Sequence, residues 1–211
     1  MVLFFNAGPL KAQTDSTANL PQFLFPEFTA SVVKLKTGTS FSAKMNYNTL
    51  SEKMTFYQNG VLLDLNKPES VDTIIIQNRQ FIYNENAFFE VLLNAPISLF
   101  IQHKSGLESL GREGAYGTKS QTVGPVSVSK LYSNGNTYNL KIPEDFKIIP
   151  STVNWIRLDS VMHKFLTERQ FLKLFPSKKE QLKQFINQSE LNINKPDDLI
   201  KLVTYCNQLF K

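Results

Sequence analysis

The chain has 211 residues, of which 42% are hydrophobic and 17 are Phe, enough for one domain with a substantial core. Its formal net charge is +5, but Lys supplies most of it, and Arg occurs only at Arg79, Arg112, Arg157 and Arg169. Because nucleic-acid readers rely on the bidentate geometry of Arg, this composition argues against a nucleic-acid partner. The single cysteine, Cys206, excludes an intrachain disulfide and is predicted to be a buried helical thiol.

Residues 1–13 are typical of the remains of an export signal. An apolar run over residues 2–5 is broken by residues 6–9, and Ala12 offers a small residue at a plausible cleavage point beside Gln13. The run is shorter than a usual signal core, which suggests a start codon assigned late or a trimmed chain. The alternative is that residues 2–5 form a strand or an anchoring arm. We expect cleavage near Ala12-Gln13 and a periplasmic or secreted product.

Residues 14–28 are expected to form an extended leader arm. Pro alternates with Phe over residues 20–28, which forbids a regular helix while supplying apolar side chains that pack on the body. Nowhere does the sequence approach the ~18 consecutive apolar residues of a membrane span, so an integral membrane protein is not expected.

Residues 29–166 predict an antiparallel β domain. Apolar and polar residues alternate in short runs, and Asn59-Gly60 between two of them is a strong hairpin signal. Connections this short join antiparallel neighbours, so we expect a meander sheet or half-barrel of about 8–10 strands. Single strands are expected over residues 31–36, 41–47, 53–57, 61–63, 71–76, 80–83, 87–93, 97–102, 153–157 and 161–165, and a further hairpin over residues 131–140.

Residues 167–211 change to a helical period and predict a three-helix segment packed on the sheet. Thr167 is expected to cap a first helix, and Ser177 with Glu180 matches a capping box that would open a second helix over residues 178–188. Pro196 is suited to the start of a third helix. Sheet and helices are segregated along the chain, so the predicted class is α+β.

Residues 106–129 contain five of the nine glycines and predict a long Gly-rich loop. Residues 111–120 resemble a phosphate-binding loop only loosely, because the glycine spacing and the place of Lys119 are wrong and no helix follows. A loop that presents Arg112, Tyr116 and Lys119 to a partner is the functional interpretation. The alternative is an unordered insertion between strands.

His103 is the candidate for chemistry, with Lys104 beside it at the start of this loop. Catalysis by His103 would need a carboxylate or nucleophile nearby, and Ser105 is the only candidate close in sequence. The alternative is a lone exposed histidine. His163 receives no role. The spacing of His, Cys and acidic residues fits neither a metal site nor a known cofactor motif, so no cofactor is predicted.

Parts of the chain resemble a group of uncharacterised exported proteins of the Bacteroidetes type. The resemblance rests on residues 25–28, 65–73, 98–105, 168–176 and 198–207 and extends over about residues 20–208. It implies export, and it carries no activity to any residue.

Together these features predict an exported, non-enzymatic envelope protein that acts as a binding or scaffolding module. Its partner would be a protein, polysaccharide or lipid of the cell envelope, with His103, Lys104, Arg112, Tyr116 and Lys119 as candidate contacts. One alternative is a periplasmic carrier of a lipid or other hydrophobic ligand inside a curled sheet. A second alternative is a hydrolase that uses His103.

Overall fold

The computed structural model describes residues 20–58, 61–110, 112–113, 119–120 and 146–210. The signal-like residues 1–13, the predicted hairpin over residues 131–140 and the candidate Tyr116 lie outside this part of the chain. Arg112 and Lys119 are described through their backbone alone, on the short paired strands β9 (Arg112–Glu113) and β10 (Lys119–Ser120).

The described chain confirms the predicted α+β class with an antiparallel sheet. Ten strands form one sheet in the order β12-β11-β8-β7-β6-β5-β1-β2-β3-β4. The strands are β1 (Thr29–Leu35), β2 (Ser40–Asn48), β3 (Lys53–Gln58), β4 (Val61–Asp64), β5 (Val71–Ile76), β6 (Arg79–Asn84), β7 (Ala87–Leu93), β8 (Ser98–Ser109), β11 (Phe146–Leu158) and β12 (Val161–Phe165).

The sheet departs from a simple meander at one place. After β4 the chain crosses back through the 3₁₀ helix η1 (Pro68–Ser70), and β5 then pairs with β1 instead of β4. This return places β1 in the middle of the sheet. Two runs of sequential hairpins, β1–β4 and β5–β12, are therefore joined side by side through β1 and β5.

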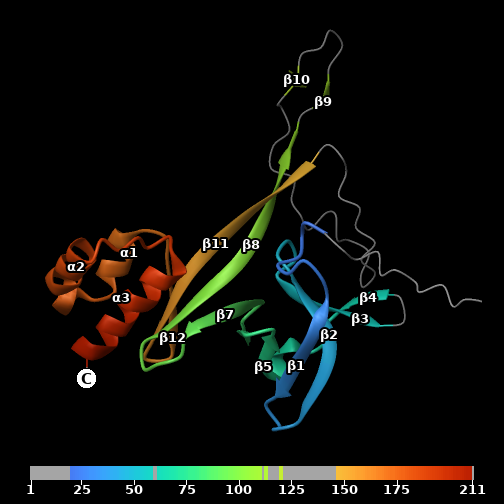
Figure 1. Ribbon diagram of the computed structural model, residues 1–211, viewed down its shortest axis with the longest axis horizontal. Coiled ribbons are helices and arrows are strands. Elements are labelled where there is room, and N and C mark those ends of the chain that lie inside the picture. Colours follow the sequence, from blue (N-terminus) through green and yellow to red (C-terminus); the bar gives the residue numbers. More distant parts are fainter. Residues whose placement is uncertain (1–19, 59–60, 111, 114–118, 121–145, 211) are drawn as a thin grey trace, which may run out of the picture.

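The predicted loop begins later than residue 106. β8 continues through Gly106 to Ser109, and every residue of this extension pairs with the first half of β11. The glycine and small polar residues here predict a loop. They form a strand because β11 runs antiparallel beside them and bonds to their backbone, which the side-chain pattern does not show. In Figure 1, β8 and β11 run together as a long ribbon between the helices and the other strands.

The sheet curls so that the end of β2 meets β8. The Ser105 backbone N–H donates to the Thr49 carbonyl over 2.9 Å, and the Tyr47 hydroxyl donates to the His103 carbonyl over 3.0 Å. Thr49 follows β2 directly, while Ser105 and His103 lie on β8, so strands distant in the sheet order touch across its concave face. The resulting inner core is filled by Phe25, Val33, Met45, Tyr47, Met54, Val71, Ile74, Ile76, Phe81 and Phe88.

A second, helical core lies at the other end of the sheet (Figure 1). Helices α1 (Glu168–Lys173), α2 (Lys179–Gln188) and α3 (Pro196–Leu209) pack over β8, β11 and β12. Cys206 of α3 is buried there as predicted, and burial raises the pKa of its thiol to about 12. At neutral pH this thiol is therefore protonated and unreactive.

The helix starts agree with the sequence at two of three places. The Thr167 side chain caps α1 by accepting from the Gln170 backbone N–H, and Pro196 opens α3. The predicted capping box at Ser177 is wrong, because Ser177 lies inside the 3₁₀ helix η3 (Pro176–Lys178). The residue before α2 is Lys178, which makes no side-chain cap. Pro176 favours the extra turn that displaces the box.

The arm that precedes β1 lies against β2 from residue 22 onward. The Asn46 side chain accepts from the Phe25 backbone N–H over 3.1 Å and donates to the Phe25 carbonyl over 2.8 Å. The Leu24 backbone N–H donates to the Tyr47 carbonyl over 2.9 Å. These bonds carry Phe25 into the inner core, where its side chain is buried.

Candidate functional site

Two places in the described chain combine a carboxylate with aromatic rings. The first, the ion-pair cluster, consists of Arg79, Glu90 and His103 on the neighbouring strands β6, β7 and β8. Glu90 pairs with Phe81 on one side and Ile101 on the other, so its side chain shares the concave face with residues two positions from these partners. Arg79 and His103 occupy those positions, which brings the three side chains together.

The ion-pair cluster is closely bonded. Nε and Nη2 of Arg79 donate to the two carboxylate oxygens of Glu90, each over 2.6 Å. Nε2 of His103 lies 2.7 Å from Oε2 of Glu90 and 2.9 Å from Nη2 of Arg79. A carboxylate only accepts and a guanidinium only donates, so the shorter contact favours a proton on Nε2 that is donated to Glu90.

The cluster holds Glu90 ionised. Burial by itself raises the pKa of Glu90, but the hydrogen bonds and charges of Arg79 and His103 outweigh it and lower this pKa to about 2. The Arg79 guanidinium carbon also lies 5.1 Å from the centre of the Phe25 ring and 5.7 Å from that of Phe81. These distances allow cation–π contact on top of the ion pair.

The cluster supplies a carboxylate for His103, as the hydrolase interpretation requires, but the hydroxyl groups near it are bonded elsewhere. Oγ of Ser105 lies 2.7 Å from Oγ1 of Thr49. The Tyr47 hydroxyl donates to the backbone carbonyl of His103, not to its ring, and burial, with the charge of Glu52, raises the Tyr47 pKa above its usual range. His103 is thus neither lone nor fully exposed; it holds Glu90 in place.

Lys104 points to the opposite face of β8 from His103. Its Nζ lies 2.9 Å from Oε1 of Glu52 in the β2–β3 turn. Nε2 of Gln102 donates to the other oxygen of Glu52, and Nε1 of Trp155 donates to Oε1 of Gln102 over 2.9 Å. This chain of contacts ties the turn to β8. His103 and Lys104 therefore have partners inside the fold, on opposite faces of one strand.

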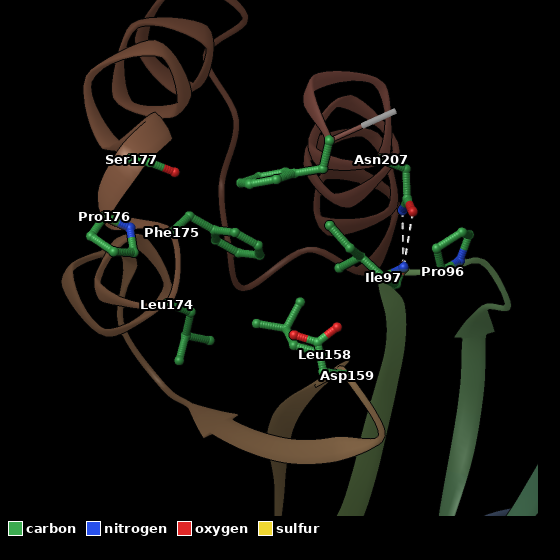
Figure 2. Close-up of a pocket in the computed structure, with 10 residues that line it drawn as sticks. Pro96, Ile97, Leu158, Asp159, Leu174, Phe175, Pro176, Ser177 and Asn207 are labelled. Atoms are coloured by element: carbon green, nitrogen blue, oxygen red, sulfur yellow. Dashed lines mark hydrogen bonds between the residues drawn. The ribbon is translucent and has the colours of Figure 1, made fainter.

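The second place is a pocket of about 490 Å³ between the helices and the ends of two hairpins, which we call the junction pocket. Figure 2 shows that its side chains come from the β7–β8 turn, the β11–β12 turn, the end of α1 with η3, and α3. The lining residues are Pro96, Ile97, Leu158, Asp159, Leu174, Phe175, Pro176, Ser177, Asn207 and Phe210.

Local structure fixes the walls of the junction pocket. The Asn207 side chain accepts from the Ile97 backbone N–H and donates to the Ile97 and Val203 carbonyls, each over 2.9 Å (dashed in part in Figure 2). This amide ties α3 to the β7–β8 turn. Opposite it, Asp159 and Ser160 have φ of 47° and 68°. Two consecutive positive φ values are typical of the tight turn that joins antiparallel strands.

The chemistry of the junction pocket is apolar with one charge. The Phe175 and Phe210 rings lie 5.6 Å apart, Phe175 almost buried and Phe210 47% exposed. Asp159 is exposed at the rim, and it has no hydrogen-bond or ion-pair partner among the described residues. In Figure 2 the Asp159 carboxylate is drawn beside Leu158, at the β11–β12 turn.

A shallower groove of about 480 Å³, the sheet groove, lies on β2 and β3 where the inner core ends. Phe41 is 44% exposed here. The lining residues are Phe41, Ser42, Ala43, Lys44, Met45, Phe56, Tyr57, Gln58, Leu65 and Asn66.

No protein-family model, curated protein or solved structure matches the chain. None of the described helices is long and apolar enough to cross a membrane. Within the same described ranges, His, Cys and acidic residues form no group of three that could hold a metal ion.

The sequence singled out His103 but none of its partners, and it missed the junction pocket. Arg79 and Glu90 are 24 and 13 residues away from His103 in the chain. Only the strand register brings them together. Asp159 lies in the short gap between the predicted runs 153–157 and 161–165, and nothing in that gap indicated the aromatic residues with which it lines the pocket.

Proposed function

We propose that this chain is a non-enzymatic binding module and that its ligand enters the junction pocket. The observation that carries the proposal is a pocket of about 490 Å³ whose walls come from four separate segments of the chain. Ligand sites are concave, mostly apolar and provided with a few polar groups, and this pocket has that composition. We further propose that the module works in the periplasm or outside the cell, as the signal-like residues 1–13 suggest.

Methyl-resolved NMR of the whole chain tests this proposal with the neutral probe 4-phenylbutan-1-ol. We expect saturable shifts at the methyl groups of Ile97, Leu158 and Leu174, which line the pocket. The methyl groups of Ile74 and Ile76 in the inner core serve as the internal control and should not move. Shifts spread over both cores, or shifts that do not saturate, would contradict the proposal.

A matched pair of variants checks the location of the probe. Phe210→Ala removes an exposed ring from the junction pocket, and Phe41→Ala removes a similarly exposed ring from the sheet groove. We expect a fall in affinity of about tenfold for Phe210→Ala, since burying one aromatic side chain contributes about 1.5 kcal/mol or more. Phe41→Ala should leave the affinity unchanged. An equal loss in both variants would exclude the junction pocket as the site.

A carrier of a hydrophobic ligand is a second candidate, favoured by the sheet groove. This groove adds apolar surface to the concave side of a sheet that we propose acts as an open half-barrel, and its size exceeds the ~300 Å³ that small ligands need. The test is titration with sodium laurate. Binding that is lost in Phe41→Ala and retained in Phe210→Ala would support the carrier over the junction pocket.

A hydrolase that uses His103 receives less support than either binding function. Nε2 of His103 is hydrogen-bonded to Glu90, and the Ser105 hydroxyl is bonded to Thr49. Turnover of ester substrates that disappears in His103→Gln with the fold intact would restore this interpretation.

A further inference from the structure

The polar groups of the junction pocket suit a ligand that donates hydrogen bonds. Among the described residues that line it, Asp159 is the only one with an ionisable side chain. The amide of Asn207 is engaged with Ile97 and Val203, so it has little left to offer a ligand. Arg157, which precedes the turn, stacks on Phe100 and donates to Ser98. A ligand therefore meets a carboxylate that no side chain of the described residues neutralises.

The aromatic pair in this pocket favours positive charge over neutral surface. A cation is attracted to the face of an aromatic ring, and groups of aromatic rings recognise quaternary ammonium ligands in this way. Phe175 and Phe210 supply two rings with centres 5.6 Å apart, and Leu158, Leu174 and Ile97 supply apolar surface for the rest of a ligand.

The ion-pair cluster shows how this same chain uses such a combination. There, the Glu90 carboxylate and the rings of Phe25 and Phe81 hold the guanidinium of Arg79. In the junction pocket the carboxylate and the two rings are present, and the described chain places no cation between them.

We propose that the junction pocket binds an amphipathic organic amine, with its ammonium group at Asp159 and its apolar body against Phe175 and Phe210. This proposal rests on the proposed function, because it names the ligand class for the same pocket. An anion would be repelled by Asp159, and a neutral donor such as a hydroxyl would hydrogen-bond to the carboxylate without neutralising its charge.

The turn itself offers a rival explanation for Asp159. Asp is one of the few residues that tolerate a φ of 47°, so the position could be Asp for backbone reasons alone. Asn and Gly tolerate the same conformation without the charge. Asp159→Asn and Asp159→Gly thus remove the charge and keep the turn, and both should fold.

Three probes with one apolar body measure the contribution of charge: 4-phenylbutylamine, 4-phenylbutan-1-ol and 4-phenylbutyrate. At low salt we expect the amine to bind about fivefold tighter than the alcohol, the size of a partly exposed ion pair, and the acid to bind weakest. Both Asp159 variants should abolish the preference for the amine over the alcohol, which is the ratio that reports on the charge. Asp72→Asn, at an exposed position of β5, is the matched control and should change nothing.

The outcomes separate this proposal from the one it rests on. Equal affinities for amine and alcohol, or an amine preference that survives in both Asp159 variants, would overturn the amine proposal and leave the binding pocket in place. Failure of all three probes to bind would overturn the proposed function as well. Added salt should shrink the preference for the amine, since exposed charges are screened.

Discussion

The ion-pair cluster and the junction pocket use similar parts with opposite results. In the cluster, strands β6, β7 and β8 together with the arm before β1 bring a carboxylate, a guanidinium and two rings together, and the side chain of Glu90 is 9% exposed. In the junction pocket, the carboxylate of Asp159 and the rings of Phe175 and Phe210 surround open space. The first arrangement is internally neutralised and stabilises the fold, whereas the second, we propose, is left for a ligand.

The difference follows from where each carboxylate lies. A carboxylate on a central strand is desolvated by its neighbours, so folding requires a partner from the same chain. A carboxylate in a hairpin turn keeps its contact with water, so the fold tolerates it unpaired. A buried ion pair is therefore explained by stability, whereas an exposed, unpaired charge beside apolar walls is the stronger indication of a binding site.

The largest expected effect is a loss of stability when the ion-pair cluster is broken. Glu90→Gln keeps the shape of the side chain but leaves the Arg79 charge, whose side chain is 32% exposed, without its partner. We expect the free energy of unfolding to fall by about 3 kcal/mol, as for other broken buried pairs. Chemical denaturation measures this loss. Glu69→Gln, at an exposed position, is the control, and equal losses in the two variants would show that the cluster contributes nothing special.

Low pH should remove the same interaction in the natural chain by protonating Glu90. Glu90 has a pKa of about 2 in the folded chain against 4.5 ordinarily, so its contribution is complete above pH 4.5 and disappears as the pH falls toward 2. We expect the stability difference between the natural chain and Glu90→Gln to shrink by about 2 kcal/mol between pH 6 and pH 3. Denaturation curves at a series of pH values test this. A difference that stays constant would mean that Glu90 is not held ionised by its partners.

The smallest effect concerns the wall of the open site. Asn207→Ala removes the amide that joins α3 to Ile97, and we expect a loss of about 1–2 kcal/mol because backbone groups lose their partners. The affinity for 4-phenylbutan-1-ol should fall as well, because the pocket wall loosens. Gln208→Ala, the exposed neighbour, is the control. Retained affinity despite lost stability would show that the pocket does not depend on this tie.

The sequence predicted much of the framework because secondary structure depends on neighbours in the chain. Alternation identified β1 and β2, the Thr167 cap placed α1, and Pro196 placed α3. The errors arose where a distant segment decided the outcome. β8 extends past Gly106 because β11 lies beside it, and no pattern within residues 98–109 records that partner.

What the sequence determined by itself was therefore the class of fold, the segregation of strands and helices, and the burial of Cys206. The tertiary structure decided what the polar residues do. Glu90 meets Arg79 and His103 only through the register of three strands, and Asp159 and Phe175 line one pocket only because the helices fold back onto a hairpin end. The period of the sequence indicates to which face of its own strand a side chain belongs. Strand pairing and the curl of the sheet determine which side chains from other strands lie beside it.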